Sequence, residues 1–307
     1  MIRTHARYCI VLSGGLMKFR LMWMIAVAVC LLFGYAVADE KATYFEILGP
    51  GRIDWCSGAF LTKGIGEPPA KKIVHNDHDR KKALNSSRTQ ALKNMVALVM
   101  ATRINADSSV RDIASKNDHV MAKVESLINA SKVVKQEYLS DGTVEIQIRM
   151  NMYGGFSQLI LPKEIEQIEA IKTVSAGKPE NTATDSVPAP EAVANHFTGL
   201  VVDAIGTQAL PAMVPAIINE NGKQVYGPAF VSREFAVQQG LCRYMTNTES
   251  ALKNPIIGKN PLVVKGLRAE GTDRSTVVIS NTDASRLLSK SENLAFLKQC
   301  RVIIVTD

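Results

Sequence analysis

The chain is poor in cysteine and in aromatic residues. It holds five cysteines in 307 residues, and only three of them follow residue 38. Three is an odd number and far too few for a small fold held together by disulfides. Aromatic residues make up 6% of the chain, and the sequence has no run of them such as sugar-binding surfaces use. These scarcities exclude a disulfide-built scaffold and give no sign of a carbohydrate-binding face.

Local catalytic motifs are missing as well. The chain has no G-x-S-x-G nucleophile elbow, no H-E-x-x-H zinc motif and no P-loop. Gly64-Ile65-Gly66 is followed by Glu67-Pro68-Pro69, which excludes a dinucleotide-binding turn. We therefore expect a protein that is not an enzyme and needs no cofactor, although a site assembled from distant residues would leave no local motif.

Excess charge is scarce outside the N-terminus. The whole chain has a net charge of +7, but residues 1–38 contain four basic residues and no acidic one. The remainder has 32 basic and 29 acidic residues, a net charge of +3, which does not argue for nucleic-acid binding. The strongest positive run, Lys71-Lys72 with Arg80-Lys81-Lys82, suits either a solvated helix face or peripheral contact with an anionic membrane or polymer.

The N-terminus has the pattern of a secretory leader. A short positive run begins at Met17, fifteen almost uniformly apolar residues follow, and Ala36-Val37-Ala38 supplies small residues before the polar Asp39. This order predicts export with cleavage between Ala38 and Asp39. The apolar run is shorter than the ~20 residues of a transmembrane helix, and Cys30 in its middle is not placed for lipidation. Met17 is an alternative start to Met1.

Hydrophobic patterns divide the remaining chain into domains 39–162 and 191–307, joined by a short helix and flexible linker over 163–190. In the first domain, short strands over 44–48 and 58–64 precede a break at 64–69. Helical periodicity predicts helices from Asp79 and over 109–130. Alternating apolar residues over Thr143–Met152 predict a strand with one face in the core, and the turn at Asp141-Gly142 joins it to a strand over 133–139 as a hairpin.

The C-terminal domain shows the same mixture of short strands and helices. The strands are expected over 197–204, 213–218, 223–226, 262–268 and 276–280, with helices over 232–239 and 283–298. The terminal strand Val302–Val305 is apolar throughout, which predicts a central position in its sheet. The fold class is therefore α+β: two small domains, each a mostly antiparallel sheet with helices packed on one face.

Two groups of residues are weak candidates for a site. His75 and His78, interleaved with aspartates, would offer metal ligands, but a closed site needs about four ligands; the alternative is a polar lead-in in which Asp77 or Asp79 caps the following helix. Cys242 and Cys300 are a possible disulfide on spacing alone. The alternative is that the cysteines are small buried side chains.

Several segments of residues 50–162 match a known family in order and character. These are Gly51-Arg52-Ile53-Asp54-Trp55, the strand that starts at Gly58, the helix stretch Arg88–Met95 and the hairpin stretch Leu139–Ile146. Together they resemble the small α/β domain of bacterial outer-membrane lipoproteins of the FlgP and FlgT type. The C-terminal part looks like the companion half of larger periplasmic relatives. The resemblance implies the periplasm of a Gram-negative bacterium, outer-membrane association, and a role in assembly with no catalytic residue.

We therefore expect a structural or interaction protein of the envelope, in a flagellar or outer-membrane assembly. Its partners would be envelope or flagellar proteins, or a second copy of itself. The physical reason is that a small sheet closed by a hairpin such as 133–152 leaves unpaired edge groups that another chain can use. The alternatives are a hydrolase of cell-wall or surface polymer and a carrier of a small periplasmic ligand.

Overall fold

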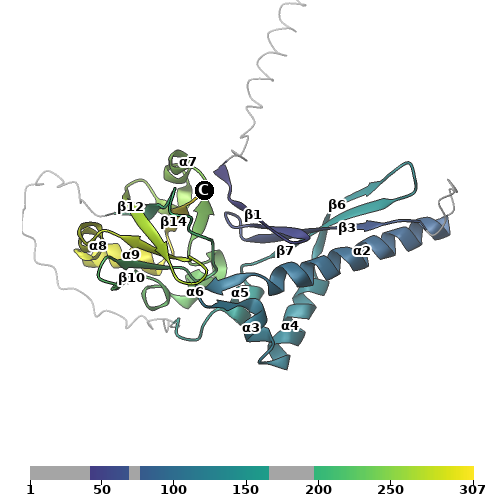
Figure 1. Cartoon of the computed structure of the whole chain (residues 1–307), viewed down its shortest axis with the longest axis horizontal. Coiled ribbons are helices and arrows are strands. Elements are labelled where there is room, and N and C mark those ends of the chain that lie inside the picture. Colours follow the sequence, from purple (N-terminus) through teal and green to yellow (C-terminus); the bar gives the residue numbers. More distant parts are fainter. Residues whose placement is uncertain (1–41, 69–76, 166–196) are drawn as a thin grey trace, which may run out of the picture. The chain divides into compact units, whose positions relative to one another are not determined.

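In a computed structural model, residues 42–68, 77–165 and 197–307 are described. The predicted cleavage site between Ala38 and Asp39 and nearly all of the predicted helix and linker over 163–190 lie outside these ranges. Residues 41–307 form one compact unit, which contains two large sheets (Figure 1). A main core of apolar side chains includes residues from both sheets, so the two halves are packed together.

The N-terminal sheet is antiparallel throughout, as predicted, with α2 (Asp77–Met100) along one face (Figure 1). The predicted hairpin is confirmed, and residues along its second strand alternate between buried and more exposed positions. The strand order is β1 (Phe45–Leu48), β2 (Gly51–Asp54), β3 (Ala59–Gly66), β7 (Val144–Asn151) and β6 (Lys132–Tyr138).

Helix α2 lies close to β3 because both contact surfaces are made of small residues: glycines on the strand, and alanine and serine on the helix. A Cβ added at Gly64 would lie 1.9 Å from the carbonyl oxygen of Ser87, and one added at Gly66 would lie 1.9 Å from that of Ala83. The Thr62 hydroxyl donates to the Ala91 carbonyl at 2.9 Å. The predicted break at Gly64 is therefore wrong by two residues: the strand continues to Gly66, where glycine admits the helix backbone.

The helix predicted over 109–130 is divided in two. It forms α3 (Val110–Ala114) and α4 (Asp118–Asn129). The division occurs because the Asn117 side chain accepts hydrogen bonds from the backbone N–H groups of His119 and Val120, which starts a new helix. In the N-terminal half, four short elements were not predicted: β2, β4 (Arg103–Asn105), β5 (Ser108–Ser109) and α5 (Gly155–Ile160).

The C-terminal sheet has seven strands and confirms the α+β class. Its hairpin β9–β10 and its pair β12–β13 are antiparallel, but the other four pairings are parallel, so this sheet is mixed rather than mostly antiparallel as predicted. The order is β10 (Gln224–Tyr226), β9 (Ala216–Asn219), β13 (Thr276–Ile279), β12 (Pro261–Glu270), β8 (Gly199–Asp203), β14 (Val302–Val305) and β11 (Arg243–Met245).

Strand β14 lies inside this sheet, between β8 and β11, and all four of its residues are buried, as its apolar sequence predicted. Ile304 joins the main core, whereas Ile303 joins a second cluster with Ala251 and Ile257. The sheet is thus covered on both faces rather than one, because parallel pairs need crossover connections. The helical segments are α6 (Arg233–Gln239), η2 (Pro228–Phe230), α7 (Thr248–Leu252), η3 (Pro255–Ile257), α8 (Asn281–Leu288) and α9 (Ser291–Lys298).

Candidate protein-interaction site

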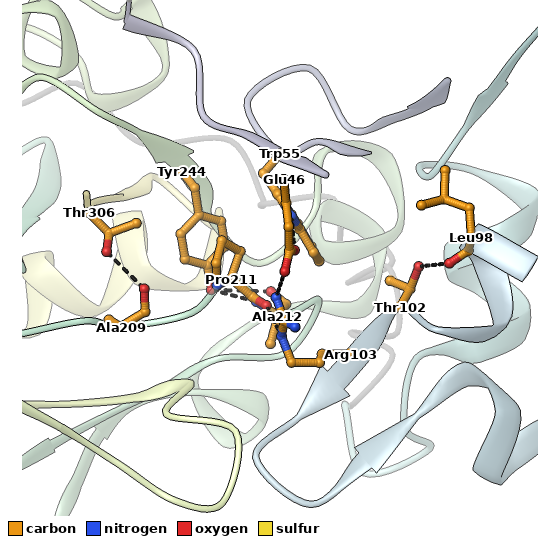
Figure 2. A network of polar contacts seen from close by, with 10 residues as sticks. All are labelled: Glu46, Trp55, Leu98, Thr102, Arg103, Ala209, Pro211, Ala212, Tyr244 and Thr306. Carbon is orange, nitrogen blue, oxygen red and sulfur yellow. Dashed lines mark hydrogen bonds and ion pairs between the residues drawn. The ribbon is translucent and has the colours of Figure 1, made fainter. Parts of the chain in front are cut away.

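A network of polar contacts joins the two halves, and its charged groups bond to one another or to the backbone (Figure 2). Arg103 forms an ion pair with Glu46 and donates from Nε to the Pro211 carbonyl at 2.8 Å. Trp55 Nε1 donates to the other oxygen of Glu46 at 2.8 Å. The side chains of Arg103 and Glu46 are only 13% and 11% exposed, respectively. Because each charge is neutralised inside the network, we assign it a structural role.

Other side chains tie the same halves together. The ring of Trp55 packs edge-on against the ring of Tyr244, with the centroids 5.7 Å apart. The Tyr244 hydroxyl is itself held within the C-terminal half by the backbone of Ala212 at 3.1 Å, as Figure 2 shows. The Arg233 guanidinium donates to the carbonyls of Gln158 and Pro162 at 3.0 and 2.7 Å, which lie at the end of α5. A cation suits the C-terminal end of a helix. These contacts explain why the two predicted domains pack as one unit.

The metal candidates are only partly described. His75 lies outside the described residues, and His78 is an exposed residue in the first turn of α2. That helix begins at Asp77, two residues earlier than predicted, so Asp77 and Asp79 both lie within the first turn, where carboxylates suit the helix dipole. Among the described residues, no three His, Cys, Asp or Glu side chains gather in a way that could hold a metal ion.

The cysteines are free thiols, so the possible Cys242–Cys300 disulfide is not formed. Both are buried, and each interacts with a different tyrosine: Cys242 with Tyr244 and Cys300 with Tyr226. Burial raises the pKa of both thiols, that of Cys300 to about 12. Cys242 and Cys300 are therefore small buried side chains, which was the alternative to a disulfide.

We expect both buried thiols to resist modification in the folded protein. A thiol reacts as its thiolate, and burial limits both the thiolate fraction and the access of a reagent. Alkylation with iodoacetamide at neutral pH, followed by peptide mass mapping, should label Cys242 and Cys300 only after denaturation. The half-buried Cys56 is the internal comparison. A 242–300 disulfide peptide recovered without reduction would contradict the assignment.

Two carboxylates with lowered pKa values serve the local fold. Hydrogen bonds from Ser109 lower the pKa of Asp112, which closes a capping box at the start of α3. Hydrogen bonds from Thr143 lower the pKa of Asp141 in the β6–β7 turn. Both residues hold a helix end or a turn, which gives no support to a catalytic role for them.

The positive run is described only in part, and its described residues are exposed. Lys71 and Lys72 lie outside the described residues, and Arg80, Lys81 and Lys82 lie on the exposed side of α2. Arg80 also stacks on the ring of Tyr138 at 5.1 Å, which links the start of the helix to β6. The exposed positions fit a solvated helix face.

The most exposed regular element that could act on a partner is β6. It lies at the edge of the N-terminal sheet (Figure 1), and all seven of its residues are exposed. Val133, Val134 and Tyr138 are 44%, 50% and 47% exposed, although they are apolar or aromatic. An edge strand presents unpaired backbone N–H and C=O groups, which can pair with another chain. The sheet therefore offers an open edge with apolar side chains beside it.

Other sheet edges are shorter or covered. The edge strands β1, β10 and β11 have four, three and three residues, and Thr43 makes a β-bridge to Met245 at the β11 edge. Where β3 extends past β2, side chains of α2 take the place of a strand. Gln90 accepts from the Ile65 N–H and Asn94 donates to the Lys63 carbonyl, both at 2.7 Å.

A groove lies beside the first residues of β6. One cavity of about 550 Å³ is lined by the ends of β6, β7 and α4 and the start of α5. A second cavity of about 440 Å³ lies against α4 and α5 and shares Leu127 and Gly155 with the first. The open edge and the groove together form the candidate site. Sequence reasoning predicted the edge from the hairpin, but it missed the groove.

Comparison with known proteins covers only the C-terminal sheet. Residues 199–307 are similar to a family described as the second domain of Tp0624 from Treponema pallidum, and the match begins at the first residue of β8. No curated protein matches this chain. In the described part of the chain, no helix is both long enough and apolar enough to cross a membrane.

Proposed function

We propose that this protein is a non-enzymatic interaction protein of the bacterial envelope and that it holds a partner protein through the open edge of β6. The observation that carries the proposal is a seven-residue edge strand with every residue exposed. Strand addition uses backbone hydrogen bonds for affinity and neighbouring side-chain pockets for specificity. The apolar side chains of Val133, Val134 and Tyr138 would add buried contact area to such a pairing.

The place of action that we propose is the periplasm of a Gram-negative bacterium, in a flagellar or outer-membrane assembly. The leader pattern ending at Ala38 supports export, and the resemblance of residues 50–162 supports the kind of assembly. N-terminal sequencing of protein from the envelope fraction should find Asp39 first. A deletion strain tested for motility and for outer-membrane integrity would distinguish the two assemblies.

The charges of β6 favour a different protein over a second copy as the partner. Lys132, Lys135 and Glu137 lie on the strand, where Lys135 pairs with Glu137 at 2.8 Å. Arg149 is paired directly opposite Lys132, so the basic residues outnumber the acidic one. Two copies paired antiparallel about Lys135 would bring Lys135 of one copy face to face with Lys135 of the other, and like charges directly opposite are destabilising. A partner strand with acidic side chains would meet no such repulsion.

The test is a crosslinked pull-down from envelopes with a matched pair of variants. The double change Val133→Lys and Val134→Lys places charges on the open edge, where lysine opposes strand pairing. Ile47→Lys makes the same kind of change on the opposite edge of the sheet, where the side chain is 78% exposed. We expect the double variant to lose the crosslinked partner and Ile47→Lys to keep it. Equal capture by all three proteins would contradict the proposal.

A further inference from the structure

The groove lies at the corner where β6 starts and where the C-terminal end of β7 extends beyond it. Lys132, the first residue of β6, is paired with Arg149, so Met150 and Asn151 of β7 extend past it. The cavity of about 550 Å³ occupies this corner, with Ser131 and Arg149 among its lining residues. A chain that paired with β6 would therefore pass the mouth of the groove.

Two residues that line the groove each carry a hydrogen-bond donor without a partner. Ser131 Oγ and Arg149 Nε are buried, and neither has a hydrogen bond to any described residue. Arg149 has one long bond from Nη2 to Ser57 Oγ at 3.4 Å, which leaves Nε unsatisfied. A buried donor without an acceptor is unfavourable, and a ligand that supplies an acceptor relieves the cost. The two donors thus indicate a missing acceptor.

The charge of the groove indicates that this acceptor is anionic. Arg149, Lys132 and Lys123 line the two cavities, and no acidic residue lines either of them. Neither Arg149 nor Lys132 forms an ion pair with a described acidic residue. A carboxylate accepts several hydrogen bonds through its two oxygens and matches the planar guanidinium of arginine. It would satisfy Ser131 and Arg149 together.

We propose that the groove binds a carboxylate side chain of the partner, carried on an extended segment that pairs with β6. This inference rests on the proposed function and names the chemistry of the partner: an acidic strand. Val134 of β6 lines the same groove, so one extended segment reaches both the edge and the two donors. A glutamate or aspartate on that segment fixes its register, because only one position along the strand faces Arg149.

The test uses purified protein and short peptides of alternating threonine and valine. One peptide has a central glutamate, a second has glutamine in its place, and N-acetylglutamate is the free carboxylate. We expect the glutamate peptide to bind about tenfold more tightly than the glutamine peptide. Arg149→Met and Ser131→Ala should each reduce this preference, whereas Lys93→Gln, on the exposed side of α2, should keep it. Circular dichroism checks that each variant is folded.

The outcomes separate this inference from the proposed function. Equal affinity for the glutamate and glutamine peptides, or no binding of either, would overturn the carboxylate site. Binding of N-acetylglutamate as tight as that of the glutamate peptide would show a small-molecule site instead of a strand site. In each of these cases the pull-down with the Val133→Lys, Val134→Lys double variant still decides whether β6 holds a partner.

Discussion

Replacing Gly64 by alanine should lower the free energy of unfolding by about 3 kcal/mol. The new Cβ would lie 1.9 Å from the Ser87 carbonyl oxygen and 2.5 Å from the Ala91 backbone nitrogen. Both atoms belong to the helix backbone, so no side chain can rotate away and α2 must move off the sheet. Movement of the helix would also strain the hydrogen bonds from Thr62 and Asn94 that join it to β3.

Urea unfolding followed by circular dichroism measures this effect. Gly155→Ala is the matched control, because its Cβ would meet nothing closer than Leu127 at 3.7 Å and the residue lies at the start of α5. We expect that control to change the stability by less than ~1 kcal/mol. A Gly64→Ala variant as stable as the control would show that the helix does not pack on the strand as described.

Replacing Arg103 by alanine should cost about 4 kcal/mol, because it leaves the buried Glu46 carboxylate without its ion-pair partner. The change also removes the hydrogen bond from Nε to Pro211, a contact between the two halves. Trp55 is the only tryptophan after residue 38, and its indole bonds to Glu46. Its fluorescence should therefore report the change at the junction directly.

The control for Arg103 is Arg268→Ala. Arg268 pairs with Glu270, but these side chains are 52% and 41% exposed, and exposed ion pairs contribute ~0–1 kcal/mol. Urea unfolding monitored by Trp55 fluorescence should separate the two variants by several kcal/mol. Equal stability of the two variants would mean that the network in Figure 2 does not hold the halves together.

The sequence predicts elements whose side-chain pattern depends on local neighbours. The alternation from Val144 to Met150 gave β7 and its buried face, and the apolar run Val302–Val305 gave a strand inside its sheet. The division of the helix over 109–130 followed from the Asn117 cap, a local signal that the apolar stripe concealed. Parallel pairing in the C-terminal sheet depends on which distant strands meet, and hydropathy does not encode that.

The candidate site was predictable only in part. A hairpin over 133–152 predicts that one of its strands can lie at an edge, and β6 does. The groove required the fold, because Ser131 lies in the short connection between α4 and β6, and Arg149 lies on a strand whose alternation indicates only that its side chain is on the more exposed face. The close contact of α2 with β3 has a sequence signal in Gly64 and Gly66, although glycines in a short strand equally predict a break.

Site-specific photocrosslinking in living cells tests the central claim most directly. A benzophenone amino acid at Val134 of β6 is compared with one at Ile47 of β1, since both side chains are exposed on opposite edges of the same sheet. The account predicts a discrete covalent adduct with one envelope protein from position 134 and none from position 47. No adduct from position 134, or the same adduct from both positions, would contradict partner binding at the β6 edge.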